Sequence, residues 1–395
     1  MRKIIASALA AFSFYSASLG EALAFASGWG TNPPLLSATI GSAYAYNTHY
    51  STYYFRGDTF ASTVCDDGNL YFTTGDTQEG FQGATSGGSN VALNTMSPAY
   101  TATMSNYVGT TANGMTAWGA ENTTSTVDNS DFKPTGITCI GGVIYMALTR
   151  FNPSTGLSQN ATIIKSSNHG STWSPAAPTP AAAPYSSPMF SGTGFAYPFF
   201  VNYSANNASN PNWDNAQTYT YAVSSATGDA THVYLGRVLT ANIGNLSASD
   251  WSFYSGSVGG NVTNASNWSS SISSATPIYT NTGSTSAYAP SVYWIPFKNR
   301  YLMLSYGEAS VTNTTWYIYE APHLSGPWTL IGSQNNSNCS PQNSGFCGTY
   351  YPFISAASIY ATNGKNVQVL TAGDYNYNSI SSGAYTLTFV QLNLQ

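Results

Sequence analysis

Alternating apolar and polar positions predict that this chain folds into many short β-strands. The clearest example is the stretch 60–74, where two runs rich in β-branched and aromatic residues flank a turn sequence at 65–69. The Asp-Gly step in that turn is a strong signal for a tight hairpin. Because hairpin strands run antiparallel, Asp58 and Asp76, which flank the two strands, should return to one edge of the sheet. No segment has a sustained helical period, so we expect almost no helix.

The same hairpin pattern recurs along the chain, and we count five copies. Their second strands begin at Tyr71, Tyr145, Tyr219, Tyr301 and Val367. In the first two copies a cysteine, Cys65 or Cys139, stands at the same distance before the tyrosine. One supersecondary unit that is repeated, with further β-rich sequence between the copies, is typical of propeller blades. The sequence therefore predicts an all-β fold, a five-bladed β-propeller.

The N-terminal residues have the features of an export signal. Two basic residues precede an apolar, small-residue stretch at 4–19, and a small-residue motif ending at Ala24 has the spacing of a cleavage site. We therefore expect a signal peptide at 1–24 and one propeller domain at 27–395, secreted to the extracellular space or the periplasm. Residues 27–54 should form an irregular entry segment that adds an outer strand to close the ring. No later apolar run is long enough to cross a bilayer, so no membrane partner is expected.

The chain is poor in charge and rich in aromatic residues. Only 6% of its residues are charged, while 42% are hydrophobic and 14% aromatic, and the formal net charge is −5. The hydrophobic content is too high for a disordered chain. The chain has too few basic residues to bind a phosphate backbone, so we expect no nucleic acid as a partner. The four histidines are scattered and no oxygen-rich loop has calcium spacing, so no residues mark a metal site, and whether a metal sits in the channel stays open. We expect a monomer without cofactor.

Four cysteines in an exported chain allow two disulfides. Cys339 and Cys347 enclose a short loop rich in Asn, Ser and Gly, and we expect them to pair. Cys65 and Cys139 occupy equivalent places near two hairpin turns. Neighbouring blades could join them in a second disulfide, or they could remain two buried thiols. The sequence leaves both alternatives open.

One rim of the predicted ring gathers most of the candidate chemistry. In every copy the start of the first strand and the end of the second strand reach this rim. It collects six of the 15 acidic residues, namely Asp58, Asp76, Glu79, Asp131, Glu308 and Asp374. Arg150 and the tyrosines Tyr197, Tyr288 and Tyr351 should lie beside them. Rings that stack on sugar faces, together with paired acids that protonate a leaving oxygen and attack or activate water, indicate a glycoside hydrolase.

We predict that the catalytic acids are Asp58, Asp76 and Glu308. The predicted substrate-binding residues are Arg150, Tyr197, Tyr288, Tyr351, Asp131 and Asp374. Structural roles are the alternative, because Asp58 could cap a loop and Asp76 could bind its own backbone. The expected substrate is an extracellular or cell-wall polysaccharide. The rival function is a non-catalytic carbohydrate-binding propeller that uses the same aromatic rim.

Two other polar motifs indicate structure rather than chemistry. Asp66 and Asp67 belong to the hairpin turn, at the far edge from the rim. The octet 166–173 resembles the Asp-box of sialidases and related propellers, with Asn168 in place of the Asp. In such families the box is a turn between the outer strands of a blade. We therefore expect His169 on an exposed turn and not as a ligand.

The run 57–77 resembles a bacterial five-bladed propeller family of formerly unknown function. Further matching stretches are 139–146, 166–173, 251–256, 301–306 and 326–328. That family is related to endo-D-arabinanase-type and other propeller glycoside hydrolases, and the resemblance covers most of the chain after the signal peptide. It implies an arabinan-like substrate, with Asp58 and Asp76 as the acids. This sequence departs from the pattern at Asn168 and in its low content of charged residues. The resemblance should therefore predict the fold better than the substrate.

Overall fold

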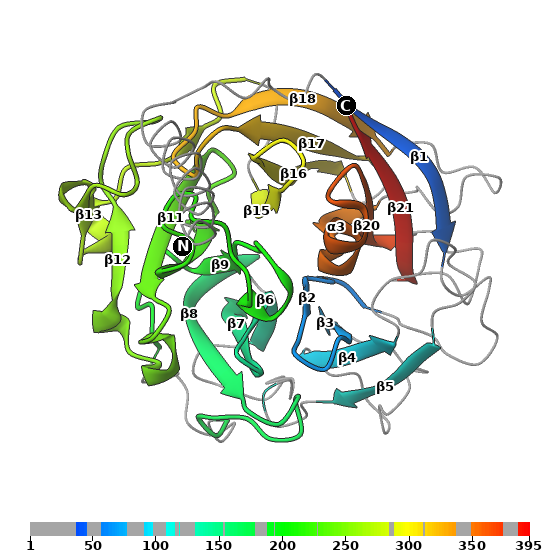
Figure 1. The fold of residues 1–395 in the computed structure, drawn as a ribbon, viewed down its shortest axis with the longest axis horizontal. Helices are drawn as coiled ribbons and strands as arrows, with labels where there is room; N and C mark the ends of the chain where they lie inside the picture. The colour runs from blue at the N-terminus through cyan, green and yellow to red at the C-terminus, as the bar shows by residue number, and fades with distance from the viewer. Residues whose placement is uncertain are drawn as a thin grey trace, which may run out of the picture.

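The computed structural model shows a ring of five β-sheets (Figure 1). The residues it describes are 37–45, 57–76, 91–97, 108–114, 118, 131–152, 155–177, 188–192, 194–226, 228–283, 288–310, 313–336, 349–373 and 386–395. The predicted five-bladed β-propeller is confirmed. Several sequence predictions fall outside the described residues, namely those on 1–24, Glu79, Asp374, Cys339 and Cys347.

The blades follow one another along the chain. Blade one contains β2 (Ser62–Val64), β3 (Leu70–Thr74), β4 (Ala92–Ser97) and β5 (Val108–Gly114). Blade two contains β6 (Asp131–Ile140), β7 (Val143–Asn152) and β8 (Leu157–Ser166). Blade three contains β9 (Tyr197–Phe200), β10 (Tyr219–Ser225), β11 (His232–Leu239), β12 (Trp251–Tyr254), β13 (Trp268–Ser269) and β14 (Tyr279–Thr280).

The last two blades complete the ring. Blade four contains β15 (Tyr288–Ile295), β16 (Arg300–Ser310), β17 (Asn313–Ala321) and β18 (Thr329–Asn335). Blade five contains β19 (Tyr350–Ile354), β20 (Asn366–Gly373), β21 (Thr386–Leu394) and β1 (Ala38–Ala45). Short 3-10 helices lie at η3 (Ala205–Asn207), η4 (Ile243–Asn245), η5 (Ala248–Asp250), η6 (Ala265–Asn267) and η7 (Ile272–Ser274).

The N-terminal strand closes the ring. β1 pairs antiparallel with β21, with Ala38 opposite Leu394 and Ala45 opposite Thr388. Blade five therefore combines strands from the two ends of the described chain (Figure 1). This is the outer strand that we expected from the entry segment.

The inner hairpins form for local reasons. Gly141 and Gly142, between β6 and β7, both have positive φ (56° and 79°), as a tight type I′ turn requires. In the turn between β2 and β3, the Asp67 carboxylate accepts hydrogen bonds from the Asn69 backbone (3.0 Å) and the Tyr71 hydroxyl (2.6 Å). The turn role that we predicted for Asp67 is thus confirmed.

Hydroxyl groups on the innermost strands join neighbouring blades. The donor and acceptor pairs are Ser62 Oγ to Ile354 O (3.3 Å), Thr135 Oγ1 to Pro198 O (2.5 Å) and Ser291 Oγ to Pro352 O (3.2 Å). Between blades one and two, the Cys139 backbone N–H donates to Thr63 Oγ1 (3.1 Å). A buried hydrogen bond contributes roughly 0.5–1.5 kcal/mol net. Together these bonds hold the innermost strands in fixed relative positions.

A short helix, α3 (Ala356–Thr362), lies at the end of β19 that is opposite the predicted rim. It follows β19 directly and lies near the centre of the ring in Figure 1. The backbone N–H of Ala356 donates to Ser62 Oγ in blade one (3.1 Å), and Ala357 and Ile359 are buried. Helix α3 therefore joins blade five to blade one at that end of the ring.

Candidate functional site

Asp58 and Asp76 lie together at the rim end of the blade-one hairpin. Asp58 and Gly75 exchange two backbone hydrogen bonds, of 2.8 and 2.7 Å, and Asp76 follows directly. Gly57 permits this close approach, because a Cβ there would lie 2.3 Å from Thr74 Cγ2 and 2.4 Å from Gly75 O. The hairpin thus separates these two acids from the turn residues at its other end, as we predicted.

A register shift recurs where the innermost strands reach the rim. It falls between Asp58 and Ser62, between Pro134 and Gly136, between Tyr288 and Ser291, and between Tyr350 and Phe353. Within three of these bulges Thr59, Ala289 and Tyr351 have positive φ (59°, 47° and 52°). A bulge re-aims side chains, and non-glycine residues with positive φ carry strain of a kind that clusters at functional sites. The rim of blades one, four and five therefore orients particular side chains.

Four tyrosines from blades three, four and five form a cluster beside the acids. They are Tyr197 on β9, Tyr288 on β15, Tyr306 on β16 and Tyr351 on β19. The Tyr197 hydroxyl donates to the Tyr351 hydroxyl (2.7 Å). Ring centroids lie 5.1 Å apart for Tyr306 and Tyr351, 5.5 Å for Tyr288 and Tyr306, and 5.9 Å for Tyr197 and Tyr288. The three tyrosines chosen from sequence thus meet, and Tyr306 is the member that sequence reasoning missed.

Burial and nearby charge keep the hydroxyls of Tyr197 and Tyr351 protonated. Burial raises the pKa of Tyr197 well above its usual value, and Tyr288 and the carboxylates of Asp58 and Asp76 raise it further. The pKa of Tyr351 is also raised well above its usual value, first by burial and then by the neighbouring tyrosines and Asp58. This electrostatic coupling places both acids near the cluster. The hydroxyls of Tyr197 and Tyr351 are therefore neutral hydrogen-bonding groups at neutral pH.

The two acids have different surroundings. Asp58 is 5% exposed and accepts a hydrogen bond from Thr59 Oγ1 (2.9 Å). The Asp76 side chain is 25% exposed and forms an ion pair with Lys133, at the start of blade two. The Lys133 ammonium also lies 4.9 Å from the centre of the Phe151 ring. The site thus combines a secluded carboxyl group with an ion-paired carboxylate, and environments that differ in this way separate acid and base roles.

Sequence reasoning missed Lys133. Its contact with Asp76 crosses from blade two to blade one, and spacing along the chain does not reveal such a contact. One signal was available, because Lys133 stands at the position of Thr59 when the first two hairpins are aligned on Tyr71 and Tyr145. In a chain with only 10 Lys and Arg, a lysine at that position could have been singled out.

The other predicted residues reach the rim through their strands. Arg150 is buried on β7, with its guanidinium carbon 5.3 Å from the centre of the Phe132 ring. Asp131 begins β6, and Glu308 lies near the rim end of β16, opposite Thr314. The structure thus brings Asp58, Asp76 and the tyrosine cluster together. The roles of Arg150, Asp131 and Glu308 remain predictions.

Potential metal ligands lie elsewhere in the described part of the chain. Its one group of three or more such side chains is Cys65, Asp66 and His169, at the turn end of the blade-one hairpin. There Cys65 and Cys139 form a disulfide, with a Cα–Cα distance of 5.2 Å, which decides between the two alternatives that the sequence left open. The functional groups that the structure describes at the rim include carboxylates, tyrosine hydroxyls, the Lys133 ammonium and the Arg150 guanidinium.

Solved structures share the fold of this chain. No family model and no curated protein sequence matches it. A proposed hydrolase from Bacteroides ovatus is similar with a TM-score of 0.53 and 13% identity, over 89% of this chain and 90% of that chain. The catalytic domain of a GH62 α-L-arabinofuranosidase from Coprinopsis cinerea has a TM-score of 0.46 and 11% identity, over 91% and 97%. The Bacteroides ovatus xyloglucan PUL protein GH43B has a TM-score of 0.48 and 12% identity, over 88% and 54%. At these identities the likeness concerns the fold alone.

Proposed function

We propose that the protein is a secreted glycoside hydrolase that acts on an extracellular or cell-wall polysaccharide. The observation that carries this proposal is the position of Asp58 and Asp76 at the rim, beside the tyrosine cluster. Hydrolysis of a glycosidic bond requires two carboxyl groups that flank the bond. Tyrosine combines a flat apolar ring, on which a sugar can stack, with a hydroxyl that can bind sugar oxygens.

Within this proposal Asp76 is the base or nucleophile and Asp58 is the acid. In its ion pair with Lys133, Asp76 is a carboxylate anion, the form that activates water or attacks the sugar. Asp58 is withdrawn from water at the rim, beside the tyrosine cluster that is proposed to bind the sugar. Such surroundings suit the group that protonates the leaving oxygen. Glu308 is retained as a third catalytic acid at the rim end of β16.

The tyrosine cluster is proposed to bind the sugar. Tyr288 and Tyr351 are partly exposed, whereas Tyr197 and Tyr306 are buried. The first two can offer ring surface to a sugar, and the buried pair supports them through ring contacts and the hydroxyl bond to Tyr351. The further proposed substrate-binding residues are Arg150, Asp131 and Asp374.

The proposal includes export, with 1–24 as a signal peptide and 27–395 as the domain that acts as a monomer without cofactor. The disulfide between Cys65 and Cys139 suits an oxidising compartment. Among the described residues, no helix combines the length and the apolar character needed to span a membrane.

The ion pair of Asp76 also favours a second candidate function, a non-catalytic carbohydrate-binding propeller. A carboxylate held by Lys133 can serve to join blade one to blade two. The rim would then bind glycan through the tyrosine cluster without cleaving it.

A panel of polysaccharides separates the two functions. The purified protein is incubated with each glycan, arabinans first, and the products are separated by chromatography. Release of oligosaccharides by the wild type, and not by Asp58→Asn, is the expected result. Glycan binding without any released product, across the panel, would contradict the hydrolase and support the binding propeller.

A further inference from the structure

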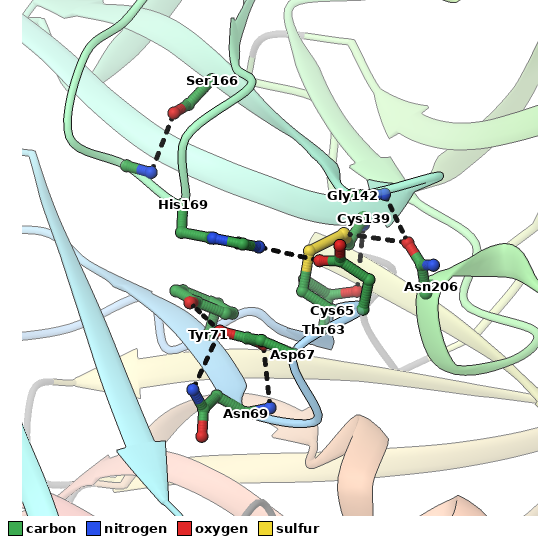
Figure 2. The surroundings of a disulfide bond; sticks show 12 residues. Thr63, Cys65, Asp67, Asn69, Tyr71, Cys139, Gly142, Ser166, His169 and Asn206 are labelled. Atoms are coloured by element: carbon green, nitrogen blue, oxygen red, sulfur yellow. Dashed lines mark hydrogen bonds and ion pairs between the residues drawn. A yellow bond between two sulfur atoms is a disulfide. The ribbon is translucent and has the colours of Figure 1, made fainter.

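The turn end of the blade-one hairpin holds a cluster of side chains that the proposed function does not use (Figure 2). The disulfide joins Cys65, beside the turn, to Cys139 on β6. The Asp66 carboxylate lies 2.7 Å from Nε2 of His169. Cys65 Sγ, a carboxylate oxygen of Asp66 and a ring nitrogen of His169 all lie within 4.8 Å of one another. Three side chains from two segments of the chain thus lie together, and Cys139, bonded to Cys65, adjoins them with its Sγ 3.3 Å from Asn206 Oδ1.

The imidazole of His169 is already oriented towards this point. Its ring stacks on the ring of Tyr71, with centroids 5.8 Å apart and an interplanar angle of 14°. Figure 2 shows the ring extending from its turn towards the disulfide of Cys65 and Cys139. The side chain is 37% exposed, in agreement with the turn that the sequence predicted. The contact of His169 with Asp66, in another blade, is a feature that the turn alone does not predict.

We propose that this cluster is a redox-dependent binding site for a thiophilic divalent cation such as Zn²⁺. A dithiol transfers two electrons and two protons to the S–S bond and is itself oxidised to a disulfide, which leaves Cys65 and Cys139 as thiols. A phosphine does the same with one water molecule and becomes a phosphine oxide. Metal binding then displaces both protons. The resulting ligands are two thiolates, the neutral imidazole of His169 and the carboxylate of Asp66.

The spacing of the cluster fits a tetrahedral ion after small movements. Zinc binds S, N and O ligands at about 2.0–2.3 Å, so neighbouring ligand atoms in a tetrahedron lie roughly 3.3–3.8 Å apart. At present His169 and Asp66 are 2.7 Å apart, and no two ligand atoms of the group with Cys65 are more than 4.8 Å apart. Two thiolates and an imidazole favour zinc over hard cations such as Ca²⁺ or Mg²⁺.

The disulfide and the metal complex are alternative states, because they use the same two sulfur atoms. In the oxidised state the disulfide joins blades one and two, and Asp66 pairs with His169. In the reduced state the ion would join the same segments through four coordinate bonds. Blades one and two are thus joined in both redox states, by the disulfide when the cysteines are oxidised and by the metal ion when they are reduced.

Zinc binding to the reduced protein tests the proposal. The Cys339→Ser/Cys347→Ser double variant leaves Cys65 and Cys139 as the only cysteines. After reduction with a phosphine and its removal under argon, Zn²⁺ is titrated against a chromophoric chelator. Co²⁺ is titrated in parallel, and circular dichroism monitors folding. We expect one ion per chain in the reduced protein, thiolate-to-cobalt charge-transfer absorption, and no such binding by the oxidised protein.

Three substitutions on exposed turns sharpen the test. His169→Gln and Asp66→Asn should each weaken zinc binding at least about tenfold, as expected for the loss of one ligand. Asp67→Asn, at a neighbouring carboxylate outside the cluster, should bind zinc as the parent does. If the reduced protein unfolds without metal, added zinc should restore its folded spectrum. The proposal is overturned if neither binding nor refolding occurs, or if His169→Gln and Asp66→Asn both bind zinc like the parent.

Discussion

Replacing Gly57 by alanine should damage the protein far more than the same change at Gly68, in the same hairpin. At Gly57 the new Cβ would lie 2.3 Å from Thr74 Cγ2 and 2.4 Å from Gly75 O, so the backbone pair of Asp58 and Gly75 must separate. Two lost hydrogen bonds at about 1 kcal/mol each, and about 1 kcal/mol for the strained φ, give a loss of about 3 kcal/mol. At Gly68 a Cβ meets nothing within 4 Å, so only the conformational cost of about 1 kcal/mol applies.

Urea denaturation of the two variants measures this difference. Gly57→Ala should unfold at a clearly lower urea concentration than Gly68→Ala, with similar slopes of free energy against urea. Gly57→Ala should also lose turnover, because Asp58 moves with the separated backbone, while Gly68→Ala keeps it. Equal midpoints for the two variants, or full turnover in Gly57→Ala, would refute the reasoning about the rim.

Substitutions at three further positions test single contacts. Asp67→Asn should leave turnover nearly unchanged and alter stability by about 1 kcal/mol at most, and a loss of activity in a folded variant would show that the wrong end of the hairpin was chosen. Burial raises the pKa of Asp67, but hydrogen bonds from Tyr71 and Asn69 outweigh burial and hold it below the usual 3.8. The stabilisation from Asp67 is thus present at neutral pH and is lost as the pH falls from 3.8 through the folded-state value. The difference between wild type and Asp67→Asn in urea midpoint should shrink over that range. Lys133→Met should lower turnover about tenfold, which corresponds to a barrier raised by about 1.4 kcal/mol. Lys133→Arg should retain most of the wild-type turnover. Equal turnover in Lys133→Met and wild type would show that the ion pair has no part in the mechanism. Tyr197→Phe removes the bond to the Tyr351 hydroxyl and should cost about 1 kcal/mol of stability and weaken glycan binding in calorimetry, whereas unchanged binding would contradict the supporting role of Tyr197.

The fold was largely predictable, because its signals are local. The turn around Gly68 and the alternating strands on each side identify one hairpin, and its repetition along the chain indicates blades. Because Cys65 and Cys139 have equivalent positions in two copies of the hairpin, the sequence also predicted that they lie at the same distance from the rim in neighbouring blades. Whether they pair depends on the distance between blades, 5.2 Å between their Cα atoms, which one sequence does not contain.

The site was predictable only in part, because its decisive contacts join different blades. The hairpin places Asp58 and Asp76 at one end, and this follows from antiparallel pairing alone. The ion pair of Lys133 with Asp76 and the contact of Tyr306 with Tyr351 depend on how blades pack against one another. The register shifts at the rim could not be predicted from the sequence either, because Thr59 and Tyr351 are residue types that do not signal positive φ.

Helix α3 was not predicted from the sequence, because its stability also depends on contacts with another blade. At seven residues it is too short to show a helical period, and it has no side-chain hydrogen bond at its N-cap. Its stability comes from tertiary contacts, such as the bond from Ala356 to Ser62 in another blade.

The turnover of Asp58→Asn and Asp76→Asn, on a polysaccharide that the wild type cleaves, tests the central claim most directly. Each variant should lose at least about a hundredfold in turnover, the lower end of what a positioned acid or base contributes. Binding of the same glycan, measured by calorimetry, should be retained, because the amide keeps the shape of the carboxyl group and the tyrosine cluster is intact. Asp66→Asn, at the other end of the hairpin, is the matched control and should cleave like the wild type. Full turnover in both Asp58→Asn and Asp76→Asn would contradict the account.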